Sequence, residues 1–334
     1  MASTLKTGPA TDSVGFPPFD ELPAVASQPQ GSLWSFFDKN GKKDELGTLN
    51  LLTKSVVLEA SQEIKFGYHV QLDWPLDNLE FPGLGRRATR HVIKDMTSEG
   101  FKGLDDEICM NTQISSQWDS LKHWSIQNQG QFYNGLDMKA ALDSPTNGIH
   151  NICERGGIVG RGILVDWLRW WEIHNTGREA PSPIQSHAIP VSDIIEVLKW
   201  QGTVTKQGDI FLIRTGYVRW HEQADTTTRR DGTRKQNRAI GVANTMETVR
   251  WLYDRHFAAV ASDTLSIEVW PYPKECCLHE WLLCQWGTPI GELWDLEKLS
   301  RTCAELKKWT FFLTSAPLHI KGGIGSPPGA IAVF

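Results

Sequence analysis

Short apolar runs with the character of buried strands recur along this sequence and alternate with segments of helical spacing. Residues 163–166 and 210–215 are such runs, and residues 191–200 and 245–256 have the apolar spacing and end signals of helices. No repeat or linker divides them. Because alternating strands and helices pack in layers around a shared core, we expect one mixed α/β domain over residues 34–334.

The same criteria predict elements elsewhere in the chain. Thr53 is placed to cap a helix that Gly67 would end. Helices are also expected over residues 276–285 and 292–306, and strands over residues 68–72, 108–114, 257–261, 310–316 and 330–334.

The first 33 residues differ from the rest of the chain. They are rich in Pro, Ser, Thr and Ala and show no sustained periodicity. We therefore expect an extended N-terminal arm over residues 1–33, lying on the surface.

Charge and hydropathy exclude two classes of partner. The net charge is -5, and the basic residues are scattered except for a short run between Arg229 and Arg238. Such a run, flanked by Thr, Asp and Gly, is most simply a solvated loop, so no nucleic-acid partner is expected. No window approaches the ~18 consecutive apolar residues that a membrane span needs, so no membrane association is expected.

The six cysteines show no paired metal-knuckle spacing, and the N-terminus has no apolar stretch resembling a secretory signal. A cytoplasmic setting is therefore expected. The glycine-rich residues 156–162 do not fit a dinucleotide-binding fingerprint, because these glycines precede a predicted strand instead of following it and opening a helix.

The densest polar cluster spans residues 113–123, directly after a predicted strand. Residues two apart in an extended segment point the same way, so Gln113, Ser115, Gln117 and Asp119 can share one face. Asp119 and His123 suit the roles of orienting carboxylate and general base, or of two metal ligands. The competing interpretation is a hydrogen-bonded loop aspartate and a half-exposed histidine.

A second cluster joins His279 and Glu280 with Glu292 among several tryptophans. A carboxylate beside apolar rings can have a raised pKa and serve as a general acid. The alternative is an amphipathic helix that turns His279 and Glu280 toward water. Cys276 and Cys277 are candidate nucleophiles only if something lowers a thiol pKa, and buried inert cysteine is the commoner case.

Fifteen tryptophans are an unusual number for a chain of 334 residues. Some are expected to form an aromatic pocket and others the core. The candidates for substrate contact lie near the polar cluster: Trp34, Trp118, Trp124 and Phe132. Core packing explains them equally well.

The segment from Gln113 to His123 resembles the signature of the cyclase family, His-x-Gly-Thr-His-x-Asp-x-Pro-x-His, which bacterial kynurenine formamidase typifies. Further segments match the family in the same order: residues 44–50, 160–166, 208–216, 263–266 and 314–318. The resemblance implies a swivelling β/β/α-type fold, assembly as a homodimer or tetramer, and hydrolysis of an amide, lactam or ester with a divalent metal that activates water.

Residue by residue, the resemblance places the metal-binding positions of the family on Gln113, Gln117 and Asp119. It places the general-base histidine on His123. The downstream histidine and glutamate correspond to His279 and Glu292.

The sequence departs from the family where the metal should bind, because both ligand histidines are glutamine. This Gln-x-Ser-Ser-Gln-Trp-Asp form resembles a fungal branch of the family, which suggests a role in secondary metabolism. A glutamine oxygen is a hard, weak ligand, so a tetrahedral zinc site built from imidazoles is lost. Zinc would need Asp119 with His123, His279 and Glu292, whereas Mn or Mg could bind more loosely with waters.

The leading hypothesis is a hydrolase that acts on a small, aromatic carbonyl substrate. His123, oriented by Asp119, would take a proton, and Glu292 or His279 would return one to the leaving group. Gln113, Gln117 and Ser116 would contact the substrate, with the two amides bonding its carbonyl.

Two alternatives remain open. One is a metal-free cyclase, dehydratase or isomerase that uses the same histidine and aspartate without consuming water. The other is a binding protein that has lost catalysis and holds a flat ligand among its tryptophans.

Overall fold

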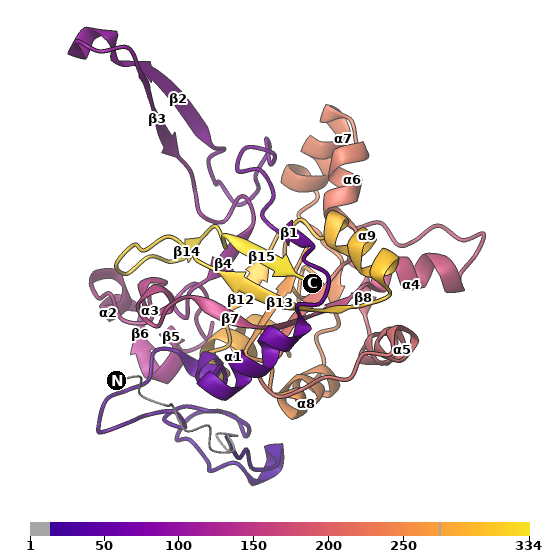
Figure 1. The fold of residues 1–334 in the computed structure, drawn as a ribbon. Coiled ribbons are helices and arrows are strands. Elements are labelled where there is room, and N and C mark those ends of the chain that lie inside the picture. Colours follow the sequence, from indigo (N-terminus) through magenta and orange to yellow (C-terminus); the bar gives the residue numbers. More distant parts are fainter. Residues whose placement is uncertain (1–13, 274) are drawn as a thin grey trace, which may run out of the picture.

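A nine-stranded mixed sheet forms the centre of the computed structural model, which describes residues 14–273 and 275–334 (Figure 1). Its strands in spatial order are β1 (His69–Gln71), β15 (Ala330–Val333), β13 (Thr310–Ser315), β7 (Ile158–Val165), β9 (Ile210–Ile213), β11 (Ala259–Ser262), β12 (Ile290–Glu292), β4 (Gln117–Asp119) and β14 (Gly325–Ser326). The four strands β7, β9, β11 and β12 are parallel, and the flanking strands are antiparallel. The expected mixed α/β domain is confirmed.

The central strands are apolar on both faces because a core lies on each side of the sheet. Along β7 and β9, Ile163 and Phe211 point into one core, whereas the adjacent Leu164 and Leu212 point into the other. This alternation follows from the two-residue period of a strand. Continuous apolar runs are typical of parallel strands covered on both faces.

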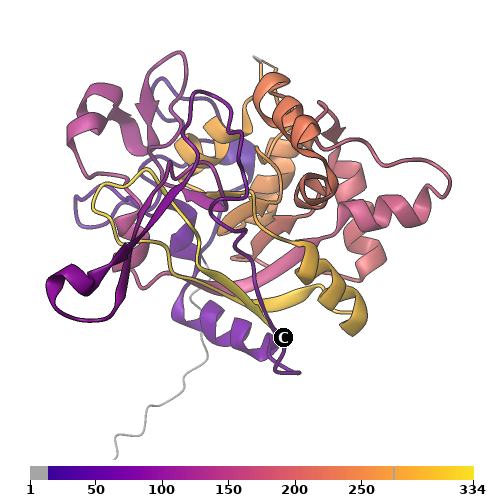
Figure 2. The ribbon, with the colours of Figure 1, turned by 90° about the horizontal axis from the view of Figure 1, so that it is seen from above.

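Helices cover both faces of the sheet (Figures 1 and 2). Residues of α4 (Trp167–His174), α5 (Val191–Gln201) and α8 (Met246–Arg255) belong to the first core, and residues of α1 (Lys54–Ala60), α3 (His150–Glu154) and α9 (Glu297–Leu306) pack with the second. The other α-helices are α2 (Met138–Asp143), α6 (Tyr217–Gln223) and α7 (Thr226–Arg230). No described helix is long and apolar enough to cross a membrane.

Shorter elements complete the chain. Two π-helical segments are η6 (Asp231–Lys235) and η7 (Glu280–Trp286), and the 3-10 turns are η1 (Phe19–Glu21), η2 (Gly47–Leu51), η3 (Ser61–Glu63), η4 (Met96–Glu99) and η5 (Tyr133–Gly135). Three two-stranded sheets pair β2 (Arg90–Asp95) with β3 (Leu104–Cys109), β5 (Gln131–Phe132) with β6 (Leu136–Asp137), and β8 (Ala188–Ile189) with β10 (Gly241–Val242).

Two predicted elements are wrong. The strand expected over residues 108–114 ends at Cys109, because residues 104–109 pair within a hairpin that projects from the body (Figure 1). The helix expected over residues 292–306 begins only at Glu297, whose backbone N–H donates to Asp295. Glu292 ends strand β12 instead.

The N-terminal segment is more tightly packed than the expected surface arm. Residues 1–13 of that prediction lie outside the described residues. From residue 14 onward the segment contributes Phe19, Leu22 and Leu33 to the first core. The backbone N–H of Leu33 also donates to the Gln285 carbonyl, so this segment covers the core directly.

Candidate active site

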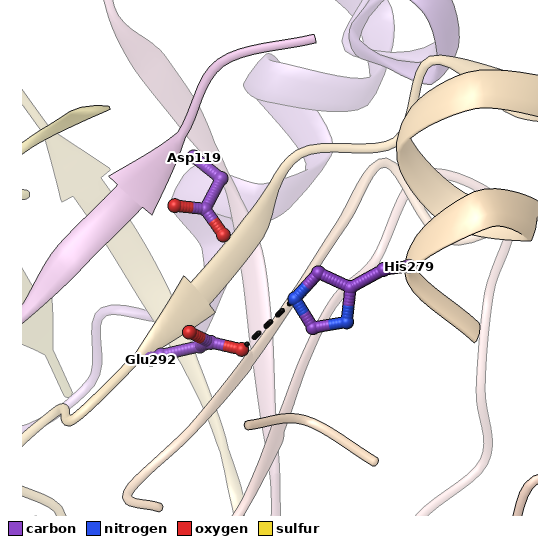
Figure 3. Close-up of side chains that lie close together, drawn as sticks. All are labelled: Asp119, His279 and Glu292. Atoms are coloured by element: carbon purple, nitrogen blue, oxygen red, sulfur yellow. Dashed lines mark ion pairs between the residues drawn. The ribbon is translucent and has the colours of Figure 1, made fainter. Parts of the chain in front are cut away.

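Three titratable side chains from separate parts of the sequence lie close together where β4 and β12 pair (Figure 3). Asp119 ends β4, Glu292 ends β12, and His279 directly precedes η7. One ligand atom from each lies within 4.8 Å of the others, and all three residues are buried. Because β12 and β4 are hydrogen-bonded neighbours, the two carboxylates are brought together by the sheet itself.

Strand alternation decides which residues of β4 face the site. Gln117 and Asp119 share one face, and Trp118 between them points to the opposite face. There the Trp118 ring packs edge-on against Trp294 at 4.8 Å, and its N–H donates to Ser315 Oγ at 2.9 Å. Trp118 is therefore a core residue in this structure.

The two glutamines hold the two carboxylates. Gln113 Nε2 donates to Asp119 Oδ1 at 2.6 Å, and Gln117 Nε2 donates to Glu292 Oε2 at 3.1 Å. Gly325, which pairs with Asp119, leaves room for this arrangement, because a Cβ there would lie 2.7 Å from Gln113 Nε2. The amide N–H groups thus neutralise part of the carboxylate charge instead of pointing to an open substrate position.

His279 bridges two glutamates. Its Nδ1 lies 3.0 Å from Glu268 Oε2, and its Nε2 lies 3.2 Å from Glu292 Oε1. Burial opposes the charged form, but the two carboxylates prevail and raise the pKa of His279 well above its ordinary value. A further donor, the Ile267 backbone N–H, reaches Glu292 Oε1 at 3.2 Å. We therefore describe His279 as an imidazolium that donates from both nitrogens.

Asp119 lies in a different environment. Burial raises its pKa, and the neighbouring Glu292 acts in the same direction, while the nearby His123 and His279 oppose the shift. Among the described residues no hydrogen bond joins Asp119 to His123; the backbone N–H of His123 donates to the Ser120 carbonyl. The expected orientation of His123 by Asp119 is therefore an electrostatic proximity, not a hydrogen-bonded pair.

A cavity of about 740 Å³, which includes its open mouth, lies above this group. Gln113, His123, His279 and Glu292 line its floor and wall. The apolar part of the lining includes Leu79, Trp124, Leu265, Trp270 and Leu293. The site thus combines titratable groups with aromatic surface, as small-molecule sites commonly do.

Several expected contacts lie elsewhere. Trp34 and Phe132 are absent from the described lining, and the Trp34 N–H donates to the Cys284 carbonyl. Ser116 Oγ donates to the Leu293 carbonyl and accepts from a backbone N–H, so its hydroxyl is occupied. The thiols are not activated, because burial and nearby glutamates raise the pKa of Cys276 to about 11.

Sequence reasoning missed Glu268, which is fully buried and bonded to His279. The one signal for this residue in the sequence was the position of a single glutamate between two apolar residues, Ile267 and Val269. It also missed Ser266 as a wall residue, although the segment 263–266 was among those that match the family. Ser266 Oγ and Trp124 Nε1 are buried and have no hydrogen-bond partner among the residues described.

The donor set fits a divalent metal. Asp119 Oδ2 and Gln117 Oε1 are both buried and without a partner in the described part of the chain. Together with Glu292 and a deprotonated His279 they offer three oxygens and one nitrogen, close to the triad in Figure 3. This oxygen-rich set suits Mn or Mg better than zinc held by imidazoles.

Comparison with known proteins supports one family. The model of the cyclase family, described as "Putative cyclase", matches residues 61–269. A crystal structure of a novel cyclase is 28% identical, with a TM-score of 0.79 over 91% of this chain and 99% of that chain. No curated protein matches.

Two isatin hydrolase structures share the fold at lower identity. Isatin hydrolase A from Ralstonia solanacearum is 17% identical, with a TM-score of 0.57 over 84% of this chain and 98% of that chain. Isatin hydrolase A from Labrenzia aggregata, bound to benzyl benzoate, is 18% identical, with a TM-score of 0.56 over 85% of this chain and 98% of that chain.

Proposed function

Because the chain belongs to the cyclase family, we propose that it hydrolyses an amide, lactam or ester bond in a small aromatic carbonyl compound. The observation that carries this proposal is the buried group of Asp119, His279 and Glu292, of which His279 and Glu292 line a partly aromatic cavity. Isatin hydrolases, which share the fold, are named for the hydrolysis of a lactam.

His123 serves as the general base. It lies on the cavity wall, half-buried, and its ring has no hydrogen-bond partner among the described residues. It takes a proton from water as the water oxygen attacks the carbonyl carbon. The nearby negative charge of Asp119 then stabilises the imidazolium that forms.

His279 serves as the general acid. Its proton, held between Glu268 and Glu292, passes to the leaving nitrogen or oxygen as the carbonyl bond to that atom breaks. The two glutamates keep the imidazole protonated until this step. The unpartnered Ser266 hydroxyl and Trp124 N–H are the proposed donors to the carbonyl oxygen.

A divalent metal, if bound, would be held by Asp119, Gln117 and Glu292. His279 would be a fourth ligand only in its deprotonated form, in which it would no longer serve as the general acid. When bound, such an ion polarises a carbonyl and lowers the pKa of a coordinated water. Mn and Mg match these ligands better than zinc does. Gln113 would keep Asp119 oriented toward the ion through its 2.6 Å hydrogen bond.

One observation favours a metal-free reaction as the second candidate. Gln113, Gln117 and His279 already donate hydrogen bonds to the carboxylates, so the protein itself stabilises part of the buried negative charge. The same groups could then catalyse cyclisation, dehydration or isomerisation, in which His123 and His279 exchange protons with the substrate.

The test is turnover of a panel containing an aryl formamide, an aryl ester and isatin, with metal content measured before and after chelation. Glu292→Gln should abolish hydrolysis, and the surface variant Glu196→Gln serves as the matched control. Stoichiometric metal whose removal abolishes turnover would support the metal-assisted form. Failure of the wild-type protein to hydrolyse any of the three compounds, with or without added Mn, would overturn the proposal.

A further inference from the structure

Two arginines line the same cavity as the titratable groups. Arg86 comes from the loop before β2, and Arg238 comes from the segment between η6 and β10. They are the cationic side chains of the described lining apart from histidine.

Arg86 is positioned relative to the floor of the site. Its Nη1 donates to the backbone carbonyl of Gln113 at 3.1 Å. The side chain of Gln113 in turn donates to Asp119. Through Gln113, the half-buried Arg86 guanidinium is therefore linked to Asp119, the carboxylate near His279. The other N–H groups of Arg86 remain available to bind a ligand.

Neither arginine is neutralised by a carboxylate of the described chain. Some other arginines of the protein are paired, such as Arg250 with Asp20 and Arg219 with Glu172. Arg86 and Arg238 take part in no ion pair among residues 14–273 and 275–334. Both unpaired guanidinium groups line one cavity, and each offers a planar fork of donors that suits a carboxylate.

The rest of the wall suits an aromatic ring. Trp124 and Trp270 lie edge to face with ring centroids 6.3 Å apart, and Leu265 extends this apolar surface. A flat ring against these side chains would gain both burial and ring contacts. The cavity thus has an apolar wall, two cationic groups and a floor of titratable side chains, and one bound molecule can contact all three.

We propose that the protein selects aromatic substrates that carry a carboxylate, which Arg86 and Arg238 bind while the ring lies against Trp124 and Trp270. This inference rests on the proposed hydrolase function, whose substrate class it narrows. The carboxylate fixes the orientation of the ring, so that the bond to be cleaved points toward His123 and His279. An uncharged aromatic compound of the same size binds in the same cavity without this orientation.

The test compares two formamides that share one ring, 4-formamidobenzoate and the neutral formanilide. The measured quantity is the ratio of their kcat/KM values. The wild-type ratio should favour the carboxylate by about tenfold or more, and R86Q/R238Q should lose this preference, because charge-assisted hydrogen bonds are among the strong ones. R87Q/R234Q, which removes two exposed arginines outside the cavity lining, is the charge-matched control and should keep the preference.

A second readout does not depend on turnover. Binding of the product 4-aminobenzoate, with aniline as its neutral counterpart, is followed by quenching of tryptophan fluorescence in the wild type and in both double variants. Hydrolysis of both formamides at equal kcat/KM would overturn the inference and leave the proposed function standing. Arginine-dependent binding of 4-aminobenzoate by a protein that hydrolyses neither formamide, nor the aryl ester or isatin with or without Mn, would support the anion site and overturn the proposed function. Neither binding nor hydrolysis would overturn both.

Discussion

Gln117 and Glu292 face each other in antiparallel register across β4 and β12, and the Gln117 amide donates to the Glu292 carboxylate at 3.1 Å. In the signature of the cyclase family this position is a histidine. An amide N–H compensates the carboxylate charge permanently, whereas a neutral imidazole nitrogen would present a lone pair to an ion. The substitution therefore replaces an imidazole nitrogen by an amide whose N–H bonds to Glu292 and whose oxygen is a weaker metal ligand.

The first prediction is that Q113H/Q117H gains zinc affinity. Two imidazoles beside Asp119 would recreate a nitrogen-rich ligand set, which zinc prefers to amide oxygens. After dialysis against zinc and then metal-free buffer, elemental analysis should find about one zinc per chain in the double variant and far less in the wild type. Equal zinc in both proteins would contradict the ligand argument.

The second prediction concerns the general base. His123→Ala should lower kcat by about 10²- to 10⁴-fold, the usual contribution of a positioned acid or base. His91→Ala, which removes an exposed histidine on the β2–β3 hairpin, is the control and should leave kcat unchanged. Retention of full turnover by His123→Ala would remove this residue from the mechanism.

The third prediction separates two tryptophans that adjoin the same motif. Trp124→Leu should raise KM with little change in the free energy of unfolding, because Trp124 lines the cavity. Trp118→Phe should lower the free energy of unfolding by roughly 1–3 kcal/mol, because it removes the N–H donor to Ser315 and the edge contact with Trp294. Steady-state kinetics and urea unfolding of both variants measure the two effects. A large KM increase in Trp118→Phe alone would reverse the assignment.

The fourth prediction is a pH dependence of stability that originates outside the site. Burial, assisted by Arg229, lowers the pKa of His221 to about 4. Its imidazole packs edge-on against Trp74 with ring centroids 4.7 Å apart. Between pH ~6.5 and 4, His221 binds a proton in the unfolded chain but not in the folded chain. The free energy of unfolding therefore falls as the pH drops from about 6.5 to 4.

His221→Phe should keep the ring packing and remove this proton linkage. The free energy of unfolding, measured by urea titration at several pH values, should then fall less steeply between pH 6.5 and 4 than it does in the wild type. His174→Phe changes an exposed histidine and serves as the control. Identical slopes for His221→Phe and the wild type would contradict the assignment.

The sequence predicted the local part of the fold well. The helix expected over residues 191–200 is α5, Val191–Gln201, and Thr53 caps α1 by accepting from the Val56 N–H. These features depend on apolar spacing and end residues that lie within a few positions of one another. The helix expected from residue 292 was wrong because Glu292 pairs with β4, far away along the chain. Such a pairing leaves no local signal.

The candidate site was likewise predicted where it depends on local sequence and missed where it depends on distant contacts. Gln113, Ser115, Gln117 and Asp119 were expected on one face from the two-residue period. The structure brings Gln113, Gln117 and Asp119 together, but residues 112–116 form a turn and Ser115 Oγ donates to the Trp74 carbonyl instead. Nothing local indicated that Glu268 would bond to His279, because the two residues are 11 positions apart and meet only in the folded chain. The glutamines were expected to bind the substrate carbonyl. In the structure their amide N–H groups donate to Asp119 and Glu292 instead.

The pairing of β4 with β12 also bears on how the protein comes to be active during its synthesis. The hydrogen bond between Gln117 and Glu292 closes a span of 175 residues. The conformational entropy cost of such a closure grows only slowly with its length, but the closure requires both ends of the span. A growing chain therefore cannot complete the proposed catalytic site until residue 292 has left the ribosome, and a proteolytic fragment that ends before β12 should be inactive however well its own helices fold.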